Sequence, residues 1–270
     1  MNRGLAIALS SLVMVMSIFL FNSCSGLTKF LTGETKDRKA VEVTERIRKP
    51  YNDRLQFSGY EWRTKSSDAR VGPGPNYFSD KENIWVDSQE LLHMQITQSQ
   101  DRWYCAEVIS ERSFGYGTYR FYIDNRVDDL DPNIVLGLFT WSDESAYSHR
   151  EIDIECSRWG NTSVNANNAQ FVVQPFNLPG RIMRFKIAPS VENSVHSFKW
   201  MKDNVFFQSI EGSDAESFDS GKVIKQWTCT KGIPQPGDEN ARINLWLVGG
   251  KPPKSNGKME VVISKFEFAP

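Results

Sequence analysis

The sequence predicts an all-β fold in which two sheets pack face to face as a sandwich. After residue 51, short apolar stretches alternate with turns, and no long window shows the 3.6-residue period of an amphipathic helix. Leu92, Met94 and Ile96 alternate with polar neighbours, as in a strand with one buried face. The segment 134–139 is almost entirely apolar, which is typical of a central strand covered on both faces.

Ten strands are expected along the chain. They lie at 90–97, 102–110, 117–124, 134–141, 150–157, 169–175, 195–201, 204–210, 242–248 and 258–268. The segment 71–76, which reads VGPGPN, is predicted to be a turn-rich loop. Many short strands separated by such turns are typical of a sandwich rather than of a helical bundle.

Composition limits the classes of function. The chain has 270 residues with a net charge of −1 and a sequence pI of about 6.3, so it has no basic excess for a nucleic-acid partner. Eight tryptophans fit a β-rich core with some left over for a stacking surface. We expect residues 51–270 to form one domain, because a single all-β domain can have this length.

The first 23 residues are predicted to be a signal peptide. Arg3 is followed by an apolar run from 5 to 21, then by Ser23 and Cys24. This ending resembles the lipobox of bacterial lipoproteins, although Phe21 stands where leucine is usual. The resemblance implies that the chain is cleaved before Cys24 and that Cys24 is then lipidated. The lipid would attach the protein to a membrane of the bacterial cell envelope, and the outer membrane and the cell surface are both compatible locations. Plain secretion and an uncleaved anchor are the alternatives.

Residues 24–50 are polar and charged and are predicted to be a tether between the anchor and the domain. Without Cys24, the cysteines are Cys105, Cys156 and Cys229, an odd number that allows one disulfide without requiring it. No CxxC pair occurs and the chain has three histidines, so no metal pattern is evident. We expect Cys156 to be a small buried residue rather than a nucleophile.

Residues 151–155 read EIDIE, with three acids alternating with two isoleucines. On a strand, Glu151, Asp153 and Glu155 share one face, where like charges repel. Paired carboxylates of this kind perform glycoside hydrolysis. Taken alone, however, such a pattern more often marks a solvated strand face.

The spacing permits catalysis without proving it. On an extended strand, the Cα atoms of Glu151 and Glu155 are roughly 13 Å apart. Retaining glycosidases need carboxyl groups about 5–5.5 Å apart and inverting ones about 6.5–9.5 Å. Strand curvature and side chains that lean over Asp153 could close that gap. Crowding should also raise the pKa of at least one acid, which would keep it protonated near neutral pH.

Other segments accompany EIDIE in a fixed order. They are GYGTYRF at 115–121, GLFTW at 137–141, VHSFKW at 195–200 with VFF at 205–207, and INLW at 243–246. Together they resemble glycoside hydrolase family 16 over residues 55–268. The resemblance implies a concanavalin A-like jelly roll that hydrolyses β-glucans and related polysaccharides with retention.

By this resemblance, Glu151 is the nucleophile, Glu155 is the general acid/base, and Asp153 lies between them and tunes one or both. EIDIE lacks the extra residue that forms a bulge in several members, which favours lichenase-like or xyloglucan-transferase-like activity. The family's range also includes laminarin and marine galactans, and the loops at 72–83, 126–133 and 211–221 are expected to choose among substrates. We expect a monomer without a cofactor; a structural cation is compatible with such a sandwich.

Aromatic and polar side chains complete the predicted site. Trp141, Trp159 and Trp246 are candidates for stacking on sugar faces. Core packing is the alternative for Trp141 and Trp246, and a turn-capping role for Trp159. Asn244 is a candidate to hydrogen-bond a sugar hydroxyl or the nucleophile. His149 is expected to line a subsite if the strand extends to it, and to lie on the surface otherwise. Trp200 is expected to belong to the core. Arg150 and Arg158 are expected either to pair with carboxylates or to contact the substrate.

Three functions remain open on this basis. The first is an endo-acting retaining hydrolase. The second is a transglycosylase that uses the same residues on envelope or matrix glycan. The third is a glycan-binding lipoprotein without turnover, against which the intact set of three acids counts.

Overall fold

The computed structural model describes residues 53–213, 222–255 and 259–270, which belong to one compact unit spanning residues 43–270. Residues 1–52, which include the predicted signal peptide, Cys24 and the predicted tether, lie outside the described residues. Within these ranges there are eighteen strands and no α-helix. The strands are β1 (Arg54–Phe57), β2 (Tyr60–Thr64), β3 (Ser67–Val71), β4 (Asn76–Phe78), β5 (Ile84–Val86), β6 (Leu92–Gln95), β7 (Thr97–Ser99), β8 (Arg102–Ser113), β9 (Gly117–Ile123), β10 (Ile134–Trp141), β11 (Ile152–Ser157), β12 (Ala169–Val173), β13 (Ile182–Phe185), β14 (Ser194–Trp200), β15 (Val205–Glu211), β16 (Val223–Cys229), β17 (Asn240–Leu247) and β18 (Glu260–Ala269).

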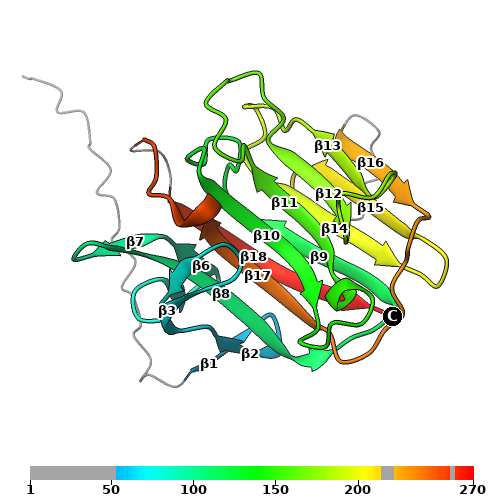
Figure 1. The fold of residues 1–270 in the computed structure, drawn as a ribbon, viewed down its shortest axis with the longest axis horizontal. Helices are drawn as coiled ribbons and strands as arrows, with labels where there is room; N and C mark the ends of the chain where they lie inside the picture. The colour runs from blue at the N-terminus through cyan, green and yellow to red at the C-terminus, as the bar shows by residue number, and fades with distance from the viewer. Residues whose placement is uncertain (1–52, 214–221, 256–258) are drawn as a thin grey trace, which may run out of the picture. The chain divides into compact units, whose positions relative to one another are not determined.

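The strands form two sheets, which confirms the predicted sandwich. The larger has eleven strands, with the central order β1-β2-β8-β17-β10-β11-β12-β13. The smaller has seven strands, in the order β16-β15-β14-β9-β18-β6-β5. In Figure 1, β10, β11 and β12 lie side by side in one layer, with β9, β14 and β18 in the other. Neighbours along both paths are antiparallel, so the larger sheet has one face for the core and one exposed face.

The core lies between the sheets and is filled by alternate residues of their strands. Leu136 and Leu138 on β10 and Ile152 and Ile154 on β11 are fully buried in it. β10 is central, as predicted, lying between β17 and β11. Because alternate residues of β10 turn away from the core, the other face of this apolar strand is available to line a site.

All ten predicted strands are present, with ends that differ by a few residues. The predicted strand at 90–97 is two strands, β6 and β7, and the predicted strand at 150–157 begins at Ile152. The predicted turns at 71–76 connect β3 to β4. Strands β1 to β5, β13 and β16 were not predicted. Their sequences carry little alternation: β3, for example, reads SDARV and has three exposed residues.

Several single-residue predictions concern the core. Trp200 is 1% exposed and packs in the core, as predicted, and Cys156 is fully buried. Cys105, Cys156 and Cys229 are all buried and free of disulfides in the described structure. A search of the described residues for a helix of sufficient length and apolarity to span a bilayer gives no candidate.

His93 on β6 lies between two carboxylates of the smaller sheet. Its Nδ1 is 2.8 Å from Glu260 and its Nε2 is 3.1 Å from Asp87, while its ring stacks on Trp85 with centroids 4.7 Å apart. Burial lowers the pKa of His93, but the hydrogen bonds and charges of Glu260 and Asp87 oppose it, and the net direction is upward. The protonated ring therefore holds β5, β6 and β18 together.

We expect the free energy of unfolding to decrease as the pH rises through the folded-state pKa of His93. A raised folded-state pKa gives a stabilisation that is fully present below the ordinary histidine value and is lost above the raised one. Urea denaturation of the wild type and of His93→Gln at about pH 5.5 and about pH 9 measures this. The variant should be less stable by about 1 kcal/mol at the lower pH, with a smaller difference at the higher pH. An equal difference at both pH values would contradict the assignment.

Candidate active site

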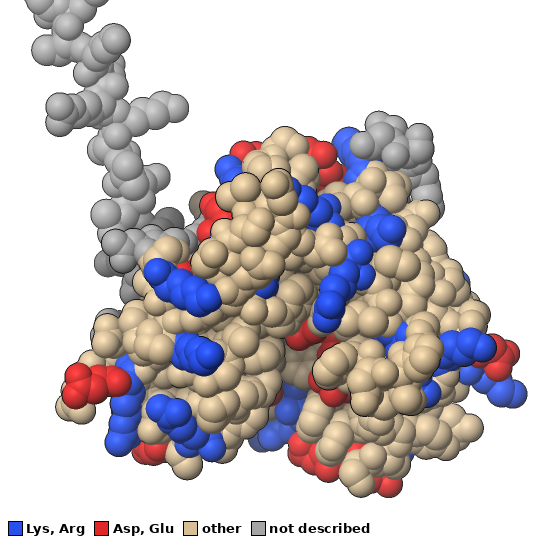
Figure 2. Space-filling view, turned by 45° about the horizontal axis from the view of Figure 1, so that its top comes forward, with Lys and Arg blue, Asp and Glu red and all other residues tan. Residues whose placement is uncertain are grey.

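The exposed face of the larger sheet carries a cleft of about 690 Å³. Figure 2 shows this hollow, with acidic side chains inside it and basic ones near its rim. Strands β10, β11 and β17 supply the floor, and the loops at 71–73, 159 and 174–176 contribute to the walls. The lining residues are Lys65, Val71, Gly72, Pro73, Glu107, Gly137, Phe139, Trp141, Asp143, Glu151, Asp153, Glu155, Trp159, Gln170, Gln174, Phe176, Arg184, Arg242, Asn244 and Trp246.

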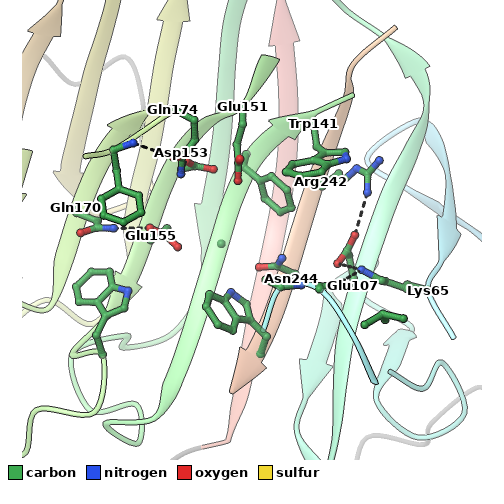
Figure 3. A pocket seen from close by; sticks show the side chains of 18 of the residues that line it. Lys65, Glu107, Trp141, Glu151, Asp153, Glu155, Gln170, Gln174, Arg242 and Asn244 are labelled. Carbon is green, nitrogen blue, oxygen red and sulfur yellow. Dashed lines mark hydrogen bonds and ion pairs between the residues drawn. The ribbon is translucent and has the colours of Figure 1, made fainter. Parts of the chain in front are cut away.

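The three acids of EIDIE lie together in the cleft (Figure 3). Asp153 and Glu155 belong to β11, and Ile154 between them points into the core, as the alternation predicts. Glu151 is not part of the strand, since β11 begins at Ile152, but its backbone is extended (φ −85°, ψ 121°). The predicted common face is therefore present, although the strand is shorter than predicted.

The chain reaches Glu151 through a left-handed turn, and this turn is the reason that the strand starts late. Four successive non-glycine residues, 147–150, have φ between 51° and 63°. Each such residue costs about 1–2 kcal/mol, so neighbouring contacts must hold the turn. Thr140 Oγ1 donates to the carbonyl of residue 150 at 2.8 Å, and the Ser142 amide donates to that of residue 149 at 2.7 Å.

The turn also corrects the prediction for His149. A strand extending to this residue would have placed His149 on the face of Glu151, and the left-handed backbone prevents this. His149 does not line the cleft. Its ring instead stacks on Trp141, with centroids 4.0 Å apart and planes 8° apart, and so covers one face of the indole.

The two arginines that flank the acids are also outside the cleft lining. Arg150 forms an ion pair with Glu144 at 2.9 Å and donates to the carbonyl of Gln235. Arg158 donates to the carbonyl of Leu130 at 2.7 Å. Arg150 therefore pairs with a carboxylate, which is one of its two predicted roles. Arg158 instead binds the backbone of the loop that contains Leu130.

Enclosure in the cleft gives the three acids unusual proton affinities. Burial, with the charge of Glu155, raises the pKa of Glu151 to about 7, although a hydrogen bond from Asp153 and the charge of Arg242 oppose the rise. Burial and the two flanking glutamates raise the pKa of Asp153 well above its usual range. Asp153 therefore keeps its proton near neutral pH and donates it in a hydrogen bond to Glu151.

Glu155 has different neighbours from Glu151. Burial raises its pKa, while a hydrogen bond from Gln170 and the charge of Arg184 lower it. The net direction is upward. The ionised forms of the two glutamates are thus favoured by separate groups, Asp153 and Arg242 for Glu151 and Gln170 and Arg184 for Glu155.

A row of residues crosses the sheet level with Glu155. β10 places Gly137 opposite both Glu155 on β11 and Asn244 on β17, and β12 places Gln170 on the other side of Glu155. A Cβ at position 137 would collide with Asn244 Oδ1. The missing side chain at Gly137 therefore leaves room in the floor for the Asn244 amide.

Two buried polar atoms on β17 have no hydrogen-bond partner among the described residues. They are Nε of Arg242, which is 7% exposed, and Oδ1 of Asn244, which is 3% exposed. Both residues line the cleft. An unpaired donor and an unpaired acceptor inside a cleft are suited to a ligand that carries hydroxyl groups.

Charged side chains form the wall of the cleft beyond Asn244. Glu107 is 1% exposed and lies between Lys65 Nζ at 2.9 Å and Arg242 Nη1 at 3.3 Å (Figure 3). Arg242 Nη2 is also 3.3 Å from Asp143. These pairings leave the Nε of Arg242 as the donor without a partner in the described structure.

Aromatic side chains line the cleft on both sides of the acids. Trp141, Trp159 and Trp246 line the cleft together with Phe139 and Phe176. Trp159 has a left-handed backbone (φ 45°), and its amide N–H donates a hydrogen bond to Ser157 Oγ at 2.9 Å. A bulky residue in this conformation is uncommon and marks a site where the surroundings fix the side chain.

Sequence reasoning missed most of the polar lining. Gln170 and Arg184 lie next to Glu155, Gln174 donates to Asp153 Oδ2 at 3.1 Å, and Lys65 contacts Glu107. Their positions depend on the pairing of distant strands, β2 with β8 for Lys65 and β11 with β12 and β13 for the others, and local sequence patterns do not encode that pairing. Of the loops expected to choose substrates, 72–83 reaches the cleft through Gly72 and Pro73. The loop at 126–133 contributes no lining residue, and most of 211–221 lies outside the described residues.

The described residues contain no group of three or more His, Cys, Asp or Glu side chains arranged to hold a metal ion.

Solved structures share this architecture. A Bacillus licheniformis β-glucanase superposes with a TM-score of 0.57 and 17% identity, covering 77% of this chain and 92% of that chain. The chain has the jelly-roll fold of the β-glucanases. A prokaryotic β-1,3-1,4-glucanase (lichenase) from a mouse hindgut metagenome matches with a TM-score of 0.51 and 20% identity, over 75% of this chain and 88% of that chain.

A third neighbour is an immunostimulatory antigen and pseudo β-1,3-glucanase of Mycobacterium tuberculosis. It matches with a TM-score of 0.54 and 18% identity, over 75% of this chain and 88% of that chain. No family model and no curated protein matches the sequence. Since the identities are low, the comparisons fix the fold, and the activity must be inferred from the cleft.

Gly137→Ala should destabilise the protein by roughly 1–3 kcal/mol, because the added methyl group overpacks against the Asn244 amide. Chemical denaturation measures the change. Asn244→Ala removes the colliding group, so the same glycine substitution should cost less in that background, with a coupling free energy of about 1 kcal/mol. Strictly additive effects would contradict the close approach of Gly137 and Asn244.

Proposed function

We propose that the chain is a retaining, endo-acting glycoside hydrolase that cleaves a β-glucan-like polysaccharide by double displacement. The observation that carries the proposal is the enclosure of Glu151, Asp153 and Glu155 in one cleft with raised pKa values. A solvated strand face, the alternative for EIDIE alone, would leave these carboxyls exposed. Asp153 is instead 3% exposed.

Glu151 is suited to be the nucleophile. The hydrogen bond from protonated Asp153 and the charge of Arg242 both favour its ionised form. In the first step, a Glu151 oxygen attacks the anomeric carbon, the bond to the leaving oxygen breaks, and Glu155 transfers its proton to that oxygen. The result is a glycosyl ester on Glu151 and an ionised Glu155.

The second step reverses these proton transfers. Water attacks the anomeric carbon, the ester bond breaks, and its electron pair returns to the Glu151 carboxylate. Glu155 takes the proton released by water. Glu155 must therefore be protonated in one step and ionised in the next, which requires an intermediate proton affinity.

The rest of the cleft supports a glycan as the ligand. Aromatic rings on both sides of the acids are suited to the apolar faces of successive pyranose units, as endo action requires. Arg242 Nε can donate to a sugar hydroxyl and Asn244 Oδ1 can accept from one, so a bound sugar would satisfy both unpaired atoms. The β-glucanase neighbours and the unbulged EIDIE favour a β-glucan.

A glycan-binding protein without turnover is the second candidate, because one structural neighbour is named a pseudo β-1,3-glucanase. The two candidates differ in the product. Laminarin, mixed-linkage glucan and xyloglucan should be tested for release of shorter chains, with an acceptor sugar added to detect transglycosylation. Binding without cleavage of any of them would favour the second candidate.

Glu151→Gln and Glu155→Gln should each lower kcat by about 10²–10⁴-fold or more, because each removes a group that reacts directly. Reducing-end assays on the cleaved polysaccharide measure the loss. Azide should restore part of the turnover of Glu155→Ala, since this anion attacks the glycosyl ester without a general base. Glu192→Gln, an exposed acid outside the cleft, is the matched control. Near-wild-type activity of either cleft variant would overturn the proposal.

The proposal includes a lipid anchor at Cys24 that attaches the enzyme to the cell envelope. The apolar run at 5–21 followed by Ser23 and Cys24 supports it. Cells that express the wild type should incorporate labelled palmitate into the protein, and Cys24→Ala should lose the label. Cys229→Ala is the control, because Cys229 is buried in the domain. Retained labelling of Cys24→Ala would contradict the anchor.

A further inference from the structure

The carboxylate of Glu155 is held from one side by a chain of two residues. Gln170 Nε2 donates to Glu155 Oε2, and Arg184 Nε donates to Gln170 Oε1 at 3.2 Å. The three residues are direct cross-strand neighbours on β11, β12 and β13, since Glu155 pairs with Gln170 and Gln170 pairs with Arg184. Figure 3 shows Gln170 pointing toward Glu155 along the cleft floor.

Arg184 determines which end of the Gln170 amide faces the acid. A guanidinium has only donors, so it must bind the oxygen of the amide. The nitrogen then faces Glu155 as a donor. Without Arg184, the amide could rotate and present its oxygen to Glu155, an arrangement that favours a protonated carboxyl.

Among the described residues, Gln170 is the side chain that donates a hydrogen bond to Glu155. β10 places Gly137 on its other side, which has no side chain. The titratable or charged groups that face Glu155 are Glu151 and Asp153 along the chain and Arg184 across the sheet. Burial disfavours the ionised form of Glu155, and Gln170 and Arg184 are the groups that favour it.

Arg184 is free to act in this way. Its side chain is exposed on β13, and within the described ranges it forms no ion pair with an acidic residue. Arg184 therefore acts on Glu155 by fixing and polarising the Gln170 amide, and no carboxylate of the described residues neutralises its charge. By contrast, Arg242 on the other side of the acids is paired with Glu107 and Asp143.

We propose that Gln170 and Arg184 are positioning residues that hold Glu155 as an ionised base for the second step of the double displacement. The inference rests on the proposed function. In that step, Glu155 accepts the proton of the attacking water while the ester bond to Glu151 breaks. The hydrogen bond from Gln170 stabilises the ionised form of Glu155 before water attacks. This hydrogen bond weakens when Glu155 takes up the proton.

The direct test is the titration of Glu155 itself, without substrate. Protein labelled with ¹³C at the glutamate carboxyls is titrated by NMR, and the Glu155 signal is assigned as the one that is absent from Glu155→Gln. Gln170→Leu and Arg184→Met should both move this titration to higher pH, because each removes stabilisation of the ionised form. Arg184→Lys should retain part of the wild-type behaviour, since it keeps the charge.

Kinetics supply the second measurement. In both variants, the alkaline fall of kcat/KM should move to higher pH, because Glu155 keeps the proton needed for the first step. With an aryl glycoside whose good leaving group makes the second step limiting, kcat near neutral pH should fall about tenfold, which corresponds to the loss of one charge-assisted hydrogen bond. Lys186→Met, which removes an exposed positive charge just beyond β13 and outside the cleft, should change neither quantity.

The outcomes separate the two proposals. If the Glu155 titration is the same in the wild type, Gln170→Leu and Arg184→Met, the positioning role is overturned, whatever the activity. If the titration moves but the wild type cleaves no polysaccharide, the proposed function fails and the contact stands as a control of proton affinity only. Thermal unfolding of each variant confirms that the domain remains folded during both measurements.

Discussion

The enclosure of three carboxyl groups along one strand is the constraint on which the rest of the cleft depends. Three negative charges cannot remain together in a site screened from water, so protons and donors must compensate them. Asp153 keeps its proton and donates to Glu151, while Gln174 donates to Asp153 and Gln170 to Glu155. The side chains next to β11 thus compensate the cost of burying its three carboxyl groups.

The larger sheet meets this constraint through its register. β11 lies between β10 and β12, so the acids have Gly137 on one side and Gln170 on the other at the level of Glu155. The absent side chain of Gly137 opens the floor toward Asn244, and the amide side chain of Gln170 supplies a donor. A one-residue slip of either neighbour would turn these side chains into the core and leave Glu155 unsupported.

The features that could be predicted from the sequence are those that local hydrophobic periodicity determines. The ten predicted strands follow from alternation or, for β10, from a continuous apolar run, and the shared face of the acids follows from a period of two. Edge strands such as β13, and the contacts of Gln170 and Arg184, depend on pairing between distant segments. The left-handed turn at 147–150 was also unpredictable, because four non-glycine residues adopt it only under the hold of surrounding groups.

In the proposed mechanism, the different neighbours of Glu151 and Glu155 allow two identical side chains to perform different tasks. Glu151 is supported by the proton of Asp153 and by Arg242, whose charge is shared with Glu107. Glu155 is supported by an amide that conveys the charge of Arg184 without transferring a proton. In the proposed cycle, the acid/base must exchange its proton twice, whereas the nucleophile exchanges none. In the proposed double displacement, the intervening glutamine lets Arg184 favour the ionised form of Glu155 without a direct ion pair, so Glu155 can still take up a proton.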